Sequence, residues 1–404
     1  MYALLKPLYL RVLSLNQWQV IATALSFFAL GFSTAAWAPL IPMVQQHLQL
    51  THSQFGILLL GAGVGSMLSM PLAGRLAHRF GCRPVLAVLL IAFTLILPAL
   101  ALSPSFWALA ATLVLFGASA GALGVTVNLQ AVQVESQQQK SLMSMFHGIC
   151  SLGGLGGVLL MTLLLSFGLP ALSSALIMSA LITVLFVVAI PFCLSAQAEQ
   201  HTAVTEQAST RSSRMSLGIL CIGLICFISF LSEGAAMDWS GIYLTSHFHV
   251  QANQAGLAYS CFAACMVAGR LSGHWLIGFF GEKNTILYSA ILAGIGLLTV
   301  VFAPVWYLVL LGYAIVGLGS SNIVPLMFSR AGHQIQMQKH IALSYVSVFA
   351  YTGSLVGPAL VGFGSEAIGL SQVFFVMAIG LFCISVLNQL ATGHRVVADQ
   401  QTPA

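Results

Sequence analysis

Long apolar runs dominate this sequence and limit the folds that it can adopt. Hydrophobic residues make up 59% of the 404 residues and charged residues 5%, against about 25% charged in a typical soluble domain. Twelve runs are long enough to cross a membrane as a helix, which takes about 20 residues. The approximate spans are 18–46, 53–78, 84–102, 106–133, 141–167, 170–194, 216–246, 254–280, 284–303, 305–329, 341–366 and 371–391. The sequence therefore predicts an all-α membrane protein with twelve transmembrane helices.

Two features divide these spans into two groups of six. Residues 195–214 are polar, rich in Ser, Thr, Gln and Ala, and lack apolar periodicity, which is typical of a flexible linker. Similar residues also recur at an offset of 200 positions. The matches are Gln54 with Gln254, Gly56 with Gly256, Phe80-Gly81 with Phe280-Gly281, Ser144 with Ser344, Gly153 with Gly353, and Gly157 with Gly357. We predict two pseudo-symmetric six-helix bundles, 1–194 and 215–404, joined by a linker at 195–214.

The basic residues indicate an orientation. All Lys and Arg fall on one side of the predicted membrane if Arg270, inside the span 254–280, is counted with that side. The positive-inside rule then places both termini and the linker in the cytoplasm. The run from Trp18 to Val44 is too long for a signal peptide, whose apolar region covers about 7–15 residues. We expect it to stay as the first membrane helix.

Several function classes find no support. The 13 Lys and Arg are spread along the chain, so nucleic-acid binding is not indicated. The eight Cys lack zinc-ligand spacing with His, which argues against a metal site or a disulfide framework. No nucleophile–base pair suggests an enzyme. We expect no cofactor and no metal.

Two acids inside one apolar run are the strongest functional candidates. Glu233 and Asp238 lie within the span 216–246, and a carboxylate at membrane depth is costly unless it faces a partner or a wet cavity. Five residues turn a helix by about 500°, so the two side chains differ by about 140° in direction. Either acid is a candidate for proton or solute coupling. The alternative is a hydrogen-bonded structural acid in a helix weakened by Gly234 and Gly241.

Other polar and aromatic residues inside the spans are weaker candidates. His147 suits a proton relay or a solute contact, and equally an interhelical hydrogen bond. Asn128 and Asn322 suit hydroxyl-rich or zwitterionic cargo, or they join helices. Trp37 and Trp239 could stack on a sugar-like ring or close an outer gate. The ordinary alternative for both is an aromatic side chain at the membrane interface.

The segment after the second span carries a family resemblance. Residues 74–84 read GRLAHRFGCRP and resemble the signature of the major facilitator superfamily, Gly-x-Leu-(Ala)-Asp-Arg-x-Gly-Arg-(Arg/Lys). His78 stands where the family usually has Asp, and Cys82 stands where a basic residue is common. The resemblance implies two six-helix bundles with a central cavity lined by the first, fourth, seventh and tenth spans.

The resemblance also implies a structural gate beside that signature. In the family an acid at the end of the fourth helix pairs with the arginines of the signature, so we expect Glu135 to pair with Arg75 or Arg79. Glu282 and Arg330 are candidates for a counterpart in the second half. His78 is either an ordinary interfacial histidine or part of a weaker, pH-sensitive latch. The residues assigned to the gate are Arg75, Arg79, Arg83, Glu135 and His78.

Two further stretches narrow the resemblance. Residues 144–154 and 233–239 look like a bacterial inner-membrane branch related to fucose-type sugar permeases. We expect a monomeric, proton-coupled transporter of a small polar solute in the bacterial inner membrane. The alternatives are an exporter of amphipathic compounds and a transporter-like ligand sensor without net flux. The drug-antiporter motif would need Gly-Pro in the fifth span, where this chain has Gly157-Val158, which weakens the exporter alternative.

Overall fold

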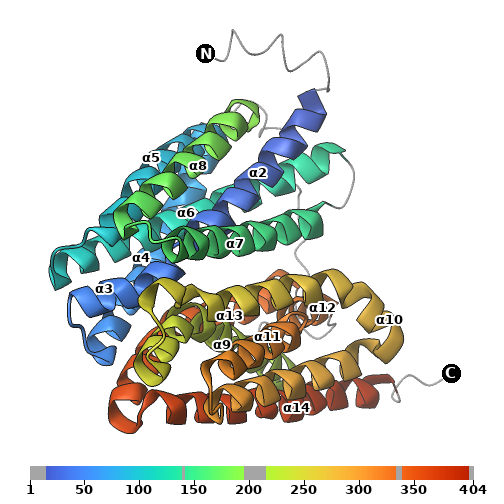
Figure 1. Ribbon diagram of the computed structural model, residues 1–404. Coiled ribbons are helices and arrows are strands. Elements are labelled where there is room, and N and C mark those ends of the chain that lie inside the picture. The colour runs from blue at the N-terminus through green and yellow to red at the C-terminus, as the bar shows by residue number, and fades with distance from the viewer. Residues whose placement is uncertain (1–14, 139–141, 195–214, 334–338, 400–404) are drawn as a thin grey trace. The chain divides into compact units, whose positions relative to one another are not determined.

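The computed structural model describes residues 15–138, 142–194, 215–333 and 339–399, and within these ranges the chain is helical without a strand (Figure 1). The predicted linker 195–214 lies outside the described residues, as do the N-terminal charges Lys6 and Arg11. The chain divides into two compact units: the first comprises Met1–Gln49 and Gly61–Thr205, and the second comprises Leu50–Leu60 and Glu206–Ala404. The division in the middle of the chain therefore falls within the predicted linker.

The first unit consists of helices that follow one another through short connections. They are α2 (Leu15–Ala35), α3 (Ile41–His47), most of α4 (His52–Phe80), α5 (Cys82–Ala101), α6 (Phe106–Gln138), α7 (Met143–Ser166) and α8 (Ala171–Ala189), with the short 3-10 turns η1 (Ala38–Leu40) and η2 (Ile190–Phe192). Together α2, η1 and α3 form one span, which is interrupted at Ala36-Trp37. The first turns of α4 pack with the second unit.

The second unit repeats this order. Its helices are α9 (Leu217–Phe248), α10 (Gly256–Val301), α11 (Trp306–Ser320), α12 (Ile323–His333), α13 (Lys339–Ile368) and α14 (Leu370–Asp399), with the 3-10 turn η4 (Ala252–Gln254). Together α11 and α12 form one span, Trp306–Ala331, which is interrupted at Ser321-Asn322.

The long helix α10 contains two membrane crossings. Its 46 residues would extend about 70 Å, more than twice the apolar thickness of about 30 Å. Gly281 breaks it with φ 75° and ψ 158°, a conformation that glycine adopts readily. By length and hydropathy, 11 stretches in the described ranges qualify as spans. Dividing Ala252–Val301 at Gly281 gives twelve, which confirms the predicted number.

Equivalent close contacts occur in the two units. A Cβ at Gly117 of α6 would fall on the carbonyl oxygen of Ala62 in α4. A Cβ at Gly317 of α11 would fall on the carbonyl oxygen of Phe262 in α10. Both pairs match at the offset of 200, so the repeat extends to the backbone contacts that bring neighbouring helices together.

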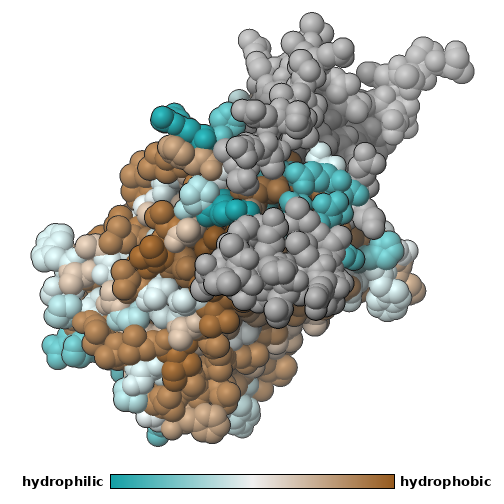
Figure 2. Space-filling view, turned by 90° about the horizontal axis from the view of Figure 1, so that it is seen from above, coloured by the Kyte–Doolittle hydropathy of each residue, from teal (hydrophilic) through white to brown (hydrophobic). Residues whose placement is uncertain are grey.

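Apolar side chains cover much of the coloured surface in the space-filling view (Figure 2). Leu68 in α4 is 73% exposed and Phe279 in α10 is 72% exposed. Such a surface would be unfavourable in water but suits lipid chains. The protein is therefore a multi-pass membrane protein.

Candidate functional site

An ion pair connects two membrane spans of the second unit. Arg270 Nη2 of α10 lies 3.7 Å from Glu233 Oε2 of α9, and the two side chains are 34% and 21% exposed. Both residues lie well inside their spans. Charged side chains at such depth are rare, and they mark binding sites, ion pathways or proton relays.

The surroundings of Glu233 leave one side of the pair open. A Cβ at Gly234 would meet no atom within 4 Å. Glu233 Oε1 is buried and has no hydrogen-bond partner among the residues that the structure describes. At 3.7 Å the Arg270–Glu233 contact is an ion pair rather than a direct hydrogen bond. Glu233 therefore keeps unused capacity to accept a proton or a hydrogen bond.

Arg270 also entered the orientation argument. It was counted there with the basic residues of one membrane side, and the structure pairs it with Glu233 inside the span. A paired arginine at this depth carries no information about which side is cytoplasmic. The signal was present in the sequence, because a basic residue ten positions inside a predicted span needs an acidic partner.

Asp238 has a different environment from Glu233. It is 6% exposed, and it forms no ion pair within the described ranges. The described contacts of the two acids therefore differ, because only Glu233 pairs with Arg270. Whether Asp238 couples to protons stays a prediction.

The two asparagine candidates differ in their contacts. Asn322 is 5% exposed, and its Nδ2 donates to Gly269 O at 2.9 Å and to Ser321 Oγ at 3.0 Å. It thereby joins the break between α11 and α12 to α10, one residue from Arg270. Asn128 is half-buried and donates to Gly124 O of its own helix at 2.7 Å. Asn128 is the freer of the two to meet a solute.

The two tryptophans are buried. Trp37, beside the break in the first span, is 2% exposed, and Trp239 is fully buried. The indole N–H of each has no hydrogen-bond partner in the described part of the chain. Trp239 packs edge-on against His52 and Phe55 at the start of α4, with ring centroids 5.6 Å and 5.9 Å away. This packing buries the Trp239 ring, and the stacking role and the gate role both stay predictions.

His147 lies in the first unit. Its exposed ring meets Phe27 of α2 edge-on, with centroids 5.2 Å apart. It is not in the same unit as Glu233. Its role as a relay stays a prediction.

The predicted ion pair of Glu135 with Arg75 or Arg79 is wrong for the described structure. Glu135 Oε2 instead accepts hydrogen bonds from the backbone N–H groups of Leu142 and Met143, both at 2.7 Å. These groups lie at the start of α7, where unpaired N–H groups and the helix dipole favour a carboxylate. The nearby backbone competes successfully with the arginines.

The other gate residues are held separately. Arg83 donates from Nε and Nη2 to Cys193 O, at 3.0 and 2.8 Å. The Arg79 guanidinium lies 5.1 Å from the centre of the Phe80 ring. Arg75 and His78 are exposed.

The second unit does contain an ion pair at the equivalent corner. Arg330 Nε donates to Glu282 Oε1 at 2.7 Å, and Arg330 Nη1 donates to Asn388 Oδ1 at 2.8 Å. Asn388 Nδ2 in turn donates to Lys283 O at 3.0 Å. The pairing of Glu282 with Arg330 is confirmed, and it joins three helical segments.

Known proteins resemble this chain over most of its length. The sequence profile of the Major Facilitator Superfamily matches residues 23–238 and 222–400. An uncharacterised MFS-type transporter of Yersinia pestis is 34% identical, over 93% of this chain and 96% of that protein. The membrane protein MosC of Rhizobium meliloti is 32% identical, over 91% and 89%.

Solved structures agree at the level of the fold. The nucleoside transporter NupG shares 13% identity, with a TM-score of 0.69 over 94% of this chain and 99% of that one. A bacterial homologue of the human lysosomal transporter Spinster, inward-facing and unoccupied, shares 13% identity, with a TM-score of 0.74 over 97% and 99%. With the profile match, these findings establish that the chain belongs to the Major Facilitator Superfamily, a family of membrane transporters that are not enzymes.

Proposed function

We propose that the protein moves a small polar solute across the bacterial inner membrane by alternating access, coupled to protons through Glu233. The observation that carries the proposal is the ion pair of Glu233 with Arg270 inside two membrane spans. A charged side chain at this depth destabilises the fold, so its presence there points to a function.

The pair is strong enough to provide coupling. Two unit charges about 4 Å apart attract each other by about 4 kcal/mol at an effective dielectric constant of 20. Coupling between two ligands of a protein typically amounts to about 1–3 kcal/mol. Partial exposure of both side chains reduces the attraction. A fraction of the attraction is still enough for a coupling free energy of this size.

Competition for Arg270 supplies the mechanism. A proton on Glu233 removes the carboxylate charge, and Arg270 then becomes available to an acceptor group of the solute. Binding of solute to Arg270 in turn favours the protonated form of Glu233, because coupling is reciprocal. Proton and solute therefore bind together and leave together, which is symport.

The accessible polar groups favour a polar solute. Arg270 and Glu233 are both partly exposed, and Gly234 leaves space beside them. An apolar solute in that space would cover the charged pair without replacing its contacts with water, which is costly. Hydroxyl, carboxylate or phosphate groups would replace them.

The first test is a thermal-unfolding screen of the detergent-purified protein. Sugars, sugar acids, amino acids and nucleosides are each added in excess, because a ligand that binds the folded state raises the melting temperature. We expect one polar class to stabilise the wild type and to lose most of its effect in Arg270→Gln. The matched control is Lys283→Gln, which removes an exposed positive charge from the same helix outside the pair.

Counterflow in proteoliposomes then tests transport. We expect the stabilising solute to exchange across the vesicle membrane, at a rate that Lys283→Gln leaves unchanged. Binding without counterflow would overturn transport in favour of a ligand sensor. Stabilisation by lipophilic compounds alone would overturn the polar solute in favour of an exporter.

A further inference from the structure

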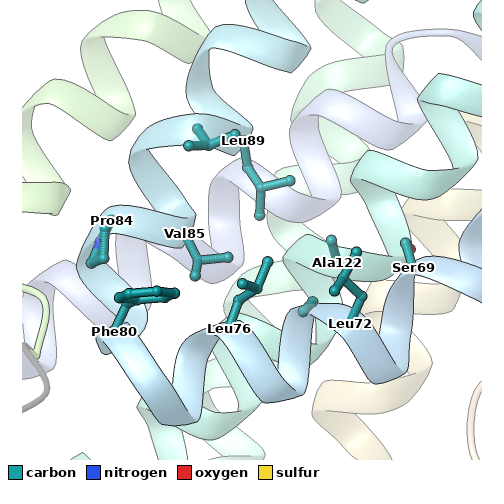
Figure 3. Close-up of a pocket in the computed structure, with 10 residues that line it drawn as sticks. Ser69, Leu72, Leu76, Phe80, Pro84, Val85, Leu89 and Ala122 are labelled. Atoms are coloured by element: carbon teal, nitrogen blue, oxygen red, sulfur yellow. The ribbon is translucent and has the colours of Figure 1, made fainter.

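An apolar groove lies along the first unit between α4, α5 and α6. It has a volume of about 270 Å³ and is lined by Ser69, Leu72, Ala73, Leu76, Phe80, Pro84, Val85, Val88, Leu89 and Ala122. Figure 3 shows Leu72, Leu76 and Phe80 along α4, facing Pro84 and Val85 at the start of α5. Leu72 and Val88 are 55% and 66% exposed, so the groove opens to the surroundings of the helices, where lipid chains lie.

One arginine, Arg79, lies at the Phe80 end of the groove, and a second, Arg75, lies one turn earlier on α4. Arg79 rests over the ring of Phe80, and Arg75 precedes it by four residues, on the same side of α4. Both are exposed, and neither forms a salt bridge within the described ranges. Glu135, which could have neutralised them, is bound to the start of α7.

The second unit lacks this combination. At the offset of 200, the ring of Tyr288 stands in place of Val88, and it packs edge-on against Phe280 with centroids 5.3 Å apart. Trp275 and Phe279 stand in place of Arg75 and Arg79. The equivalent positions thus carry bulky rings and no arginine, so this combination of residues occurs in the first unit and not at the matching positions of the second.

We propose that this groove binds one anionic phospholipid, with an acyl chain along Leu72, Leu76 and Val88 and the phosphate at Arg79 and Arg75. The apolar lining matches a hydrocarbon chain, and the unpaired guanidinium groups match a phosphate, which arginine binds in a bidentate manner. Arginines at the end of a membrane helix attract anionic headgroups. The site is independent of the Glu233–Arg270 pair, and the lipid is a structural ligand rather than cargo.

The test measures lipid binding to the delipidated, detergent-purified protein. Dioleoyl phosphatidylglycerol is titrated against dioleoyl phosphatidylcholine, and bound lipid is counted by native mass spectrometry. We expect the wild type to retain one phosphatidylglycerol in preference to phosphatidylcholine. Arg79→Gln should weaken phosphatidylglycerol binding about fivefold, the contribution of one arginine near a membrane surface. The charge-matched control Lys283→Gln should bind like the wild type.

A second variant tests the apolar part separately. Val88→Tyr introduces the residue that the second unit has at this position, and it should abolish the retained lipid. Val184→Tyr is the matched control, because Val184 in α8 is 59% exposed and is not part of the groove. It should leave lipid binding unchanged.

Three results would overturn the proposal. Equal retention of the two lipids by the wild type would show that the site does not recognise the anionic headgroup. Equal lipid binding by Val88→Tyr and Val184→Tyr would show that the acyl chain does not lie in the groove. Displacement of the lipid by inorganic phosphate at the same concentration would make the site a plain anion site.

Discussion

The corner at Gly81, between α4 and α5, and the corner at Gly281, inside α10, have similar backbone conformations but differ in chemistry. Gly81 and Gly281 both adopt positive φ, 85° and 75°. Two positions related by the offset of 200 show the difference. The first unit has Cys82 and Gln130 where the second has Glu282 and Arg330. Gln130 Oε1 accepts from the backbone N–H of Leu194 at 3.0 Å, whereas Arg330 reaches Glu282 and Asn388.

This difference separates what the repeat retains from what it changes. In the first unit Gln130 is hydrogen-bonded to Leu194, just after the last helix. In the second unit Arg330 is hydrogen-bonded to Asn388 of the last helix, α14, and forms an ion pair with Glu282 of α10. The neutral corner does not use Glu135, which caps α7, so Arg75 and Arg79 stay available. The interior differs in the same way, because Ser33 and Met70 stand in the first unit where the second has Glu233 and Arg270.

The largest expected effect tests the shared backbone. Gly117→Ala and Gly317→Ala would each press a Cβ onto a carbonyl oxygen of the neighbouring helix, and backbone cannot yield as a side chain does. We expect each to lower the free energy of unfolding by about 3 kcal/mol or more, measured by thermal unfolding in detergent.

The controls for this prediction are glycines with free space. Gly124→Ala in α6 and Gly278→Ala in α10 meet no atom within 4 Å, so they should be neutral or stabilising by up to about 1 kcal/mol. A loss confined to one unit would contradict the equivalence of the two contacts.

The second prediction concerns the ionic corner. Glu282→Cys leaves Arg330, which is 7% exposed, without its counter-charge, and should cost about 2–3 kcal/mol of unfolding free energy. The double variant Glu282→Cys/Arg330→Gln reproduces the residues of the first unit and should recover at least half of that loss. Additive losses in a double-mutant cycle would show that the two corners are not interchangeable.

The smallest effect concerns Glu135, which binds the start of α7 instead of the arginines of the first unit. Glu135→Gln removes the charge at the start of α7 and should cost about 1 kcal/mol. Arg75→Gln and Arg79→Gln should leave the unfolding free energy unchanged, since neither arginine pairs with Glu135. If Arg79→Gln lowered the unfolding free energy as much as Glu135→Gln, the result would support the ion pair that the family signature implies.

The spans and the repeat could be predicted from the sequence, because each depends on local composition or on a fixed offset. The break at Gly281 also follows, since Glu282 and Lys283 interrupt the apolar pattern there. The interruptions at Trp37 and Asn322 were not predicted. They lie inside apolar runs, where tertiary contacts such as the bond from Asn322 to Gly269 O decide the backbone.

The site could be predicted only in part. Glu233 was identified by its depth in the membrane, but its partner Arg270 depends on how α9 and α10 are rotated toward each other, which spacing within one helix does not determine. Glu135 was assigned to the arginines because the family pattern pairs them. The free N–H groups of Leu142 and Met143, only a few residues away, were the closer partners.

The most direct test of the central claim measures proton entry driven by solute. Proteoliposomes carrying a pH-sensitive dye receive the solute that stabilises the protein most in the thermal screen. We predict acidification with the wild type and with Glu282→Gln, which weakens an ion pair outside the site. Glu233→Gln should retain solute counterflow but lose solute-driven acidification. Acidification per solute that is unchanged in Glu233→Gln would contradict the account.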